Sequence, residues 1–207
     1  SAGTLKVTGS LANTALSVSS GAIFDVDATD EIGSISGSGD IDLASGVTLT
    51  AGGLNNASTI FSGVISGDGA FSKAGSGTTT LSGANTFSGE TSINEGTLLV
   101  SGSLSDSTVV DVASGSNYKV GSNDTIGGLQ GAGSADLNTN TLTVNIADPN
   151  GSTTFSGVIA ASGSGSSLVK EGSGTLELSE ANTYEGATSV SAGTLKVTGS
   201  LANTALS

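Results

Sequence analysis

The side chains that could act as acids, bases or metal ligands in this sequence are almost all carboxylates. The 207 residues include 18 Asp and Glu, five Lys, and no Arg, His or Cys. Without His or Cys, no Ser-His-Asp or Cys-His arrangement can form, and zinc sites of the common type lack their ligands. Two kinds of chemistry stay open, namely glycoside hydrolysis by a carboxylate pair and coordination of Ca²⁺ by carboxylate oxygens.

Glycoside hydrolysis requires two convergent carboxyl groups and a surface that holds a sugar. The acidic residues are instead spread along the chain and mostly alternate with apolar residues, as solvated strand positions do. No aromatic platform for a sugar stands out either, since aromatic residues make up 3% of the chain. We therefore predict that the protein is not an enzyme, with a β-helical carbohydrate-active enzyme as the least favoured alternative. The acidic positions considered are Asp25, Asp40, Asp106, Asp124, Asp136 and Glu177.

The densest run of acidic residues lies in the segment FDVDATDEIG, and we call its four members the N-terminal acidic cluster: Asp25, Asp27, Asp30 and Glu31. Their oxygens could suit Ca²⁺, but the spacing does not match the EF-hand loop. The corresponding segment YKVGSNDTIG later in the chain retains only Asn123 and Asp124. We therefore expect a solvated turn, with no bound metal and no other cofactor.

The charge of the chain is one-sided, with a formal net charge of −13 at pH 7. Its lysines are scattered singly, whereas a nucleic-acid-binding surface needs clustered Lys and Arg, so we expect no nucleic-acid partner. No apolar run approaches the length of a membrane span, and we expect no direct membrane insertion. Because Ser1 opens directly into a strand pattern, we expect a fragment or mature piece without a signal peptide or anchor.

The elements that must position these side chains are short strands with alternating apolar residues, separated by Gly-Ser and Asn-Asn turns. Leu176 and Leu178 flank Glu177 in this way, and Leu195 and Val197 flank Lys196, so the four apolar side chains should point inward. Strands in the first part of the chain are expected at Thr4–Val7, Ala15–Val18, Ile23–Val26, Ile32–Ile35, Ile41–Leu43 and Val47–Thr50.

Two related halves make up most of the chain, namely residues 1–93 and 94–190. They align at offsets of 93 to 94 residues through most of their length and 97 at the end, so small insertions separate them. The insertion at 148–151 holds the single proline and predicts a protruding turn. Such linear repetition of short strands, with no helical stretch for crossovers, favours parallel strands stacked in a coil.

The predicted fold is therefore an all-β, single-stranded parallel β-helix, a β-solenoid that runs continuously over residues 1–207. A turn of about 20–25 residues gives about nine turns and a rod of roughly 40–45 Å. Residues 191–207 are identical to residues 1–17 at every position, so they restart a 190-residue period. The chain then represents one period of a longer tandem array plus the start of the next, unless it was built deliberately from a repeated unit.

A longer motif dominates each half: residues 75–100, GSGTTTLSGANTFSGETSINEGTLLV, return as residues 172–197, GSGTLELSEANTYEGATSVSAGTLKV. Each copy has a Gly-Ser-Gly turn, a Thr/Leu strand, an Asn-Thr-aromatic corner and a Gly-Thr-Leu-x-Val strand. Asn suits a corner because it tolerates left-handed backbone and bonds its own backbone. The motif residues are Asn85, Thr86, Phe87, Gly96, Leu98, Val100, Asn182, Thr183, Tyr184, Gly193, Leu195 and Val197.

This motif resembles the passenger-associated strand repeat of bacterial autotransporter adhesins. The resemblance implies a right-handed β-helix that is secreted through a separate outer-membrane barrel and located outside the cell or on the bacterial surface. It implies a noncatalytic stalk or adhesin segment, acting in cell adhesion or biofilm formation, that could contact a host or neighbouring cell. Adjacent repeats of the same protein are the expected partners. Both ends of the coil are open edges without caps, so end-to-end association is also expected, and a self-assembling extracellular filament or matrix subunit is the alternative.

Overall fold

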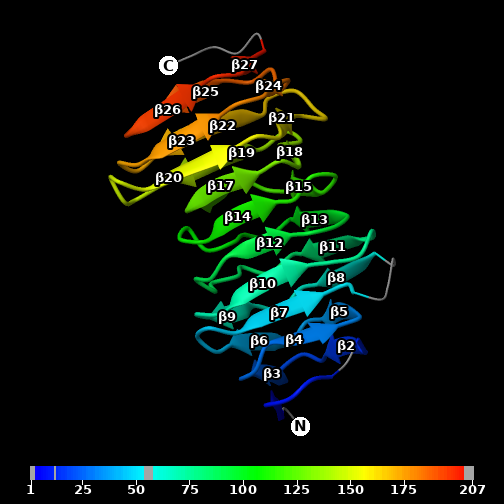
Figure 1. The fold of residues 1–207 in the computed structure, drawn as a ribbon. Coiled ribbons are helices and arrows are strands. Elements are labelled where there is room, and N and C mark those ends of the chain that lie inside the picture. The colour runs from blue at the N-terminus through cyan, green and yellow to red at the C-terminus, as the bar shows by residue number, and fades with distance from the viewer. Residues whose placement is uncertain (1–2, 12, 54–57, 203–207) are drawn as a thin grey trace.

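A computed structural model of the chain describes residues 3–11, 13–53 and 58–202. Within these ranges every regular element is a β-strand, and the paired strands are parallel. The strands stack into an elongated parallel β-solenoid of about ten turns, which confirms the predicted fold class (Figure 1).

The coil has three faces, which the chain visits in the same order in every turn. The first face carries β1 (Thr4–Val7), β3 (Ile23–Val26), β6 (Asp40–Leu43), β9 (Ile65–Gly67), β16 (Asp124–Ile126), β19 (Thr141–Asn145), β22 (Ser167–Glu171) and β25 (Thr188–Val190). The second face carries β4 (Asp30–Ile32), β7 (Thr48–Ala51), β10 (Ala70–Lys73), β12 (Thr91–Ile93), β14 (Val109–Val112), β17 (Gly128–Gly131), β20 (Ser152–Phe155), β23 (Thr175–Leu178) and β26 (Thr194–Val197). The third face carries β2 (Ala15–Val18), β5 (Ser34–Gly37), β8 (Thr59–Phe61), β11 (Thr78–Leu81), β13 (Thr97–Val100), β15 (Asn117–Val120), β18 (Ser134–Asp136), β21 (Val158–Ala160), β24 (Ala181–Asn182) and β27 (Ser200–Leu201).

Two turns cross the first face without a strand, between β9 and β16. Residues 85–87 occupy one of these turns and residues 103–106 the next. They still bond to their neighbours, since the Thr86 amide donates to Ile65 O at 2.8 Å and the Asn85 amide to Ser103 O at 2.9 Å. The stack of turns therefore continues through this break in the ladder.

The length of a turn varies along the coil. Register partners in successive turns are 17 residues apart in the case of Asn117 and Ser134, and 26 residues apart in the case of Thr141 and Ser167. Several turns are thus shorter than expected, which is why the chain makes about ten turns where about nine were predicted. The connection between β19 and β20 is one of the long connections between strands. Its turn at 148–151 is exposed and projects from the rod, with the Gly151 amide bonded to Asp148 O at 2.9 Å (Figure 1).

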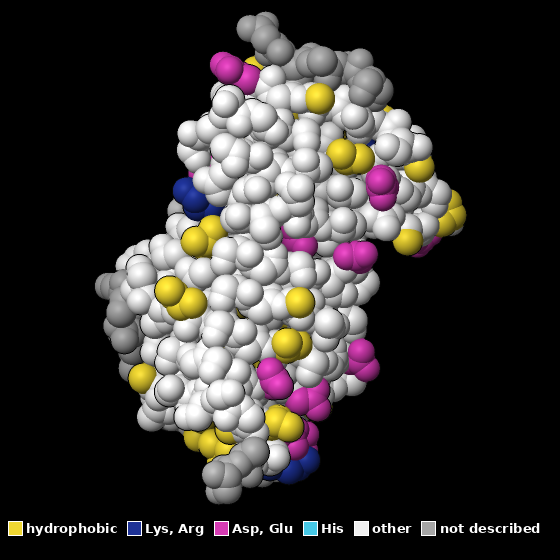
Figure 2. Space-filling model, turned by 180° about the vertical axis from the view of Figure 1, so that it is seen from behind, with side chains coloured by type: hydrophobic (Ala, Val, Ile, Leu, Met, Phe, Trp, Pro, Cys, Tyr) yellow, Lys and Arg dark blue, Asp and Glu magenta, His cyan; other side chains and the backbone are white. Residues whose placement is uncertain are grey.

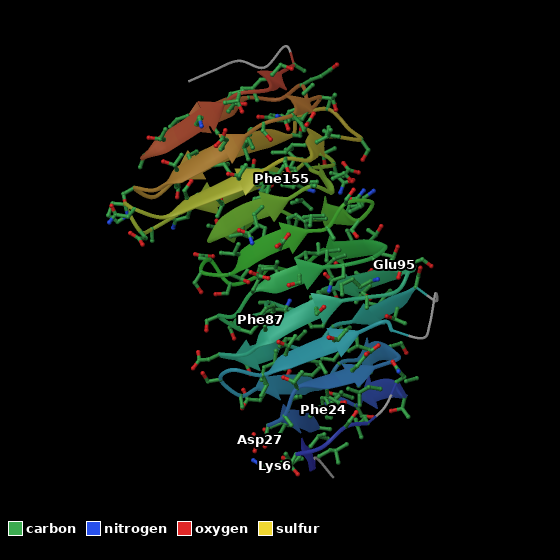
Figure 3. All side chains as sticks on the ribbon, in the orientation of Figure 1. Lys6, Phe24, Asp27, Phe87, Glu95 and Phe155 are labelled. Carbon is green, nitrogen blue, oxygen red and sulfur yellow. The ribbon has the colours of Figure 1, made fainter. Side chains whose placement is uncertain are left out.

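The core is a narrow column inside the coil. Alternation along the strands places Leu176 and Leu178 inside with no exposed surface, while Glu177 between them faces outward. All five Phe and both Tyr of the chain are buried, and Figure 3 shows Phe24, Phe87 and Phe155 within the stack. The surface in Figure 2 carries hydrophobic side chains as separate spots rather than a continuous patch.

Two expectations about strands need correction. The strand expected at Ile32–Ile35 is divided at Gly33, where the chain turns a corner and the Gly33 amide bonds to Thr14 O at 2.8 Å. A side chain there would meet the backbone of the preceding turn, because a Cβ on Gly33 would lie less than 3.0 Å from Asn13 O. Leu195 is only partly buried and Val197 is 37% exposed, since β26 lies in the last described turn and is covered on one flank only.

Candidate functional site

Buried side chains in each copy of the motif, and in the four residues before it, bond one turn to the next. The first is Lys73, at the end of β10, whose side chain is 1% exposed. Its ammonium group donates to Ala74 O at 2.6 Å, to Gly75 O at 2.5 Å and, in the following turn, to Glu95 O at 3.0 Å. A buried charge requires such partners. Burial lowers the pKa of Lys73, and the Glu95 carboxylate opposes this shift.

The second copy of the motif repeats this arrangement at Lys170. The side chain has no exposed surface, and its ammonium group donates to Glu171 O, to Gly172 O at 2.9 Å and to Ala192 O at 3.4 Å. Burial lowers the pKa of Lys170 as well. In each copy the lysine therefore bonds the Gly-Ser-Gly segment that follows it in the chain to the loop just before the Gly-Thr-Leu-x-Val strand in the next turn of the solenoid. We call these two groups the lysine locks.

A glycine follows the last carbonyl of each lock. Gly96 and Gly193 have φ of 70° and 67°, in the left-handed region that favours glycine. Space demands glycine as well, because a Cβ at either position would lie closer than 3.0 Å to carbonyl oxygens of the turn below. The strands that follow differ in burial. Leu98 and Val100 are fully buried, whereas their counterparts in β26 are covered on one flank, as described above.

The asparagines of the two corners bond three successive turns. Asn85 Oδ1 accepts the Ile65 amide at 3.0 Å, while Nδ2 donates to Gly83 O at 3.0 Å and to Ser103 O at 2.9 Å. Asn182 does the same, with Ile159 N at 2.9 Å, Glu180 O at 3.0 Å and Ser200 O at 3.2 Å. Both asparagines are 2% exposed, and neither has a positive φ. Asn182 lies in strand β24 and Asn85 in the stretch that crosses the first face without a strand, so both connect turns rather than provide left-handed backbone.

The two residues after each asparagine alternate between outside and inside. Thr86 and Thr183 are exposed, whereas Phe87 and Tyr184 have no exposed surface. Phe87 lies against Phe71 with ring centroids 6.3 Å apart, and the Tyr184 hydroxyl bonds to Thr188 Oγ1 at 2.6 Å. Burial raises the pKa of Tyr184.

The acidic residues that lie in equivalent places of the two halves also connect turns. Asp30 accepts the Leu11 amide at 3.0 Å on both carboxylate oxygens, and Asp124 accepts the Leu104 amide at 3.2 Å on both. Burial raises the pKa of Asp124 from 3.8 to about 6, although hydrogen bonds from the Leu104 and Thr125 amides and from the Tyr118 hydroxyl favour its charged form. Asp124 is 6% exposed and therefore has little access to solvent.

The structure disperses the N-terminal acidic cluster. Asp25 and Asp27 form ion pairs with Lys6, the former at 3.4 Å, near the N-terminal end of the rod (Figure 3). Asp30 points to the preceding turn, as described above, and Glu31 faces outward. In the part of the chain that the structure describes, no three His, Cys, Asp or Glu side chains converge in a way that could hold a metal ion.

A polar hollow lies on the first face, beside the break in its ladder. It measures about 450 Å³ and is lined by Ser103, Asp106, Asn123, Asp124, Thr125, Thr141 and Thr143. Both oxygens of Asp124 already accept backbone amides, and Asp106 is the one other carboxylate of this lining. Asp25, Asp40 and Glu177 lie on other turns, and Asp136 lies on the third face of the coil. The hollow therefore lacks the second free carboxyl group that hydrolysis of a glycoside needs.

No helix within residues 3–11, 13–53 and 58–202 has the length and apolar character required to cross a membrane.

A stack of parallel turns held together by buried side chains defines a solenoid repeat protein. The sequence model of the Passenger-associated-transport-repeat family matches residues 71–100 and 168–197. Both segments are such repeats, and their setting in a parallel β-solenoid fits the passenger β-helix of an autotransporter, which confirms the resemblance found in the sequence. No curated protein and no solved structure matches the chain.

The family match begins four residues before the motif recognised in the sequence, and those residues include the lysine of each lock. From the sequence, Lys73 and Lys170 were interpreted only as scattered single charges, so their role was missed. A signal was present, because each lysine falls on the inward position of its alternating strand, two residues after Phe71 or Leu168, and precedes a Gly-Ser-Gly turn.

Proposed function

We propose that this chain is a noncatalytic, rod-like segment of a passenger at the bacterial cell surface or secreted from it, where it projects other parts of the protein or mediates adhesion. The use of the motif side chains supports this proposal. Lys and Asn of both repeats are buried and hydrogen-bonded between turns, and the aromatic residue of both repeats is buried in the core. Side chains engaged in this way hold turns together and are not free to act on a substrate.

The dimensions of the coil also suit a spacer. About ten turns, at a strand spacing of ~4.8 Å, span about 50 Å along the axis. The acidic surplus of the chain keeps such a rod soluble and reduces lateral association with other rods.

A length series on a bacterial surface tests the spacer role. One, two or three copies of residues 1–190 are placed between an N-terminal epitope and a membrane anchor, and energy transfer from the epitope to a membrane dye gives its height. We expect each copy to raise the epitope by roughly 45 Å, from nine to ten turns per copy. Leu178→Asp, which places a charge in the core, should abolish the rise, while the outward Glu177→Ala should preserve it. An epitope that stays at one height as copies are added would contradict the proposal.

Adhesion is tested on the same cells. Binding to host or neighbouring cells is measured for the rod alone and for the rod with an adhesive tip. Binding by the rod alone would assign adhesion to the coil itself, whereas binding only with the tip would assign it a purely projecting role.

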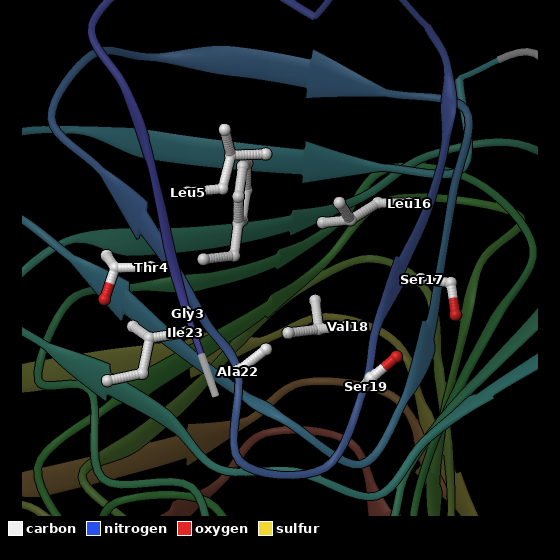
Figure 4. Close-up of a pocket in the computed structure, with 10 residues that line it drawn as sticks. Gly3, Thr4, Leu5, Leu16, Ser17, Val18, Ser19, Ala22 and Ile23 are labelled. Atoms are coloured by element: carbon white, nitrogen blue, oxygen red, sulfur yellow. The ribbon is translucent and has the colours of Figure 1, made fainter. Parts of the chain in front are cut away.

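A self-assembling filament is the second candidate, and the apolar N-terminal edge of the coil favours it. Leu5 is 52% exposed and Ile23 is 42% exposed, and they border a hollow of about 310 Å³ (Figure 4). Sedimentation velocity over a range of concentrations separates the two candidates. A filament subunit should grow in length as the concentration rises, whereas a spacer segment should keep one size.

A further inference from the structure

The 17-residue segment that occurs twice in the chain is seen in two different surroundings. In the first copy the strand Thr4–Val7 contacts the turn that follows it, and in the second copy the strand Thr194–Val197 contacts the turn that precedes it. Because the two copies are identical in sequence, the contacts of each copy indicate which residues would pack on the open flank of the other copy.

The first copy presents one covered and one open flank. Strand β1 pairs with β3 in the register Leu5 to Phe24 and Val7 to Val26, and Lys6 lies beside Asp25, with 3.4 Å between the ammonium and carboxylate groups. On the other flank Leu5 is 52% exposed, and the hollow of about 310 Å³ opens below it. Figure 4 shows Leu5 among the residues that surround this opening.

The second copy presents the opposite flank. Strand β26 pairs with β23 in the register Leu195 to Leu176 and Val197 to Leu178. Lys196 lies beside Glu177, with 3.0 Å between the ammonium and carboxylate groups.

Placing both sets of neighbours around one segment gives a complete junction. The apolar columns then run from Leu176 through the shared Leu to Phe24, and from Leu178 through the shared Val to Val26. The shared Lys lies between Glu177 on one side and Asp25 on the other, a favourable sequence of charges. Stacking β1 directly on β26 would instead place Lys6 opposite Lys196, and like charges in that position repel.

We propose that the apolar N-terminal edge of this chain is the surface on which residues 172–190 of a preceding copy of the same sequence pack, so that tandem copies form one uninterrupted coil. This inference rests on the proposed role as a spacer and specifies its partner and register. The occupant of the edge is the turn that carries β23, which already holds the identical segment in this chain.

The junction fixes how successive copies are rotated. The Gly-Thr-Leu-x-Val strand occurs three times, and its copies β1, β13 and β26 lie on the first, third and second faces. Counted in chain order, including turns that cross a face without a strand, β13 lies 14 faces after β1 and β26 lies 14 faces after β13. One period therefore spans 28 faces, which is nine full turns and one face more.

Each copy is consequently turned by one face, or a third of a turn, relative to the copy before it. A given side chain then appears on all three faces in successive copies and returns to its first face only after three copies, which is 28 turns or roughly 135 Å. A ligand that binds one face of the rod finds the same side chains on that face once in three periods. A matrix that surrounds the rod finds these side chains on all three faces.

Distances between spin labels test the rotation. The chain contains no Cys, so labels can be attached at single introduced cysteines. The protein is a two-period chain in which residues 1–190 precede the full 207-residue sequence. Leu99 faces outward on β13 and Ser92 faces outward on β12, in the same turn and on neighbouring faces.

The proposal predicts which pair is shortest. Leu99→Cys in the first copy and Ser92→Cys in the second should lie on one face nine turns apart, at about 43 Å. Leu99→Cys in both copies should give a longer distance, because part of it runs across the coil. The 207-residue chain labelled at Glu31→Cys and Glu177→Cys, seven turns apart on the second face, calibrates the advance and twist per turn. The Leu99 pair being the shorter one, or broad distances in both pairs, would overturn the proposal.

A charge at the junction tests the contact separately. Leu195→Asp, numbered from the start of each chain, should lower the melting temperature of the two-period chain more than that of the 207-residue chain. The reason is that only the two-period chain covers both flanks of this residue. Thr194→Asp on the outward side is the matched control and should shift neither chain appreciably. Equal shifts for Leu195→Asp in the two chains would overturn the junction. These measurements use purified protein and are independent of the epitope height on cells. The junction proposal and the spacer proposal can therefore be refuted separately.

Discussion

The lysine locks give the strongest test of how the motif stabilises the coil. Lys170→Met shortens the buried side chain by one atom, so it creates little cavity, and it removes the charge and the donors. Three carbonyl oxygens lose a charge-assisted partner, and each buried acceptor left unpaired costs about 1–3 kcal/mol. Removing the buried charge returns part of this cost. We expect a net loss of about 3–5 kcal/mol in the free energy of unfolding, the magnitude found when one partner of a buried charged interaction is removed.

Urea unfolding followed by far-ultraviolet circular dichroism measures this loss, since the chain contains no Trp for fluorescence. Lys73→Met in the first motif should give a loss of similar size, because its ammonium group bonds equivalent carbonyls. Lys196→Met is the matched control, since its side chain is 55% exposed and surface substitutions change stability by about 0.5 kcal/mol or less. If Lys170→Met and Lys196→Met shift the urea midpoint equally, the locks do not hold the turns together and the reasoning is refuted.

Three further predictions concern the core, the pH dependence and metal ions. Leu178→Asp buries an unpaired charge and should unfold the neighbouring turns, whereas Glu177→Ala should be nearly silent, so equal melting temperatures would contradict the inward and outward assignments. Asp124 has a folded-state pKa raised from 3.8 to about 6, so the native state holds its proton longer than the unfolded state does. Its contribution to stability should fall by up to about 3 kcal/mol as the pH rises from below 4 to above 6. Asp124→Asn should remove that part of the profile in urea titrations at several pH values, and an unchanged profile would show that another group causes it. Calorimetry in EDTA and then in Ca²⁺ should give one unfolding temperature, and a large rise with Ca²⁺ would reveal a site in the N-terminal acidic cluster.

Local features of this fold were readable from the sequence because they depend on neighbouring residues. Alternation around Glu177 identified both faces of β23, and the repeated Asn-Thr-aromatic pattern marked the two segments that the family model matches. Gly33, in contrast, divides an expected strand because of the backbone one turn below, which local alternation cannot reveal. The role of Lys73 depends in the same way on Glu95 O, a partner 22 residues away.

The face on which a strand lies was also beyond sequence reasoning. It depends on the summed lengths of all preceding turns, and these lengths differ, as the separations of Asn117 from Ser134 and of Thr141 from Ser167 show. Three of the four extra residues of the second half lie in the connection between β21 and β22, which adds no strand, so both halves advance by the same number of faces. An equal insertion that added a strand would have shifted every later strand to another face.

The short spacing of register partners also determines how the chain can fold. Each strand pairs with the strand one turn away in the chain, so the entropy cost of closing a turn does not grow with the length of the rod. Folding can therefore start at either end and advance one turn at a time, as in other solenoids. A chain delivered end first through a narrow pore would complete its leading turns while the remainder was still extended. Each completed turn buries more apolar surface outside the pore and opposes backward movement, so folding itself would drive the chain outward.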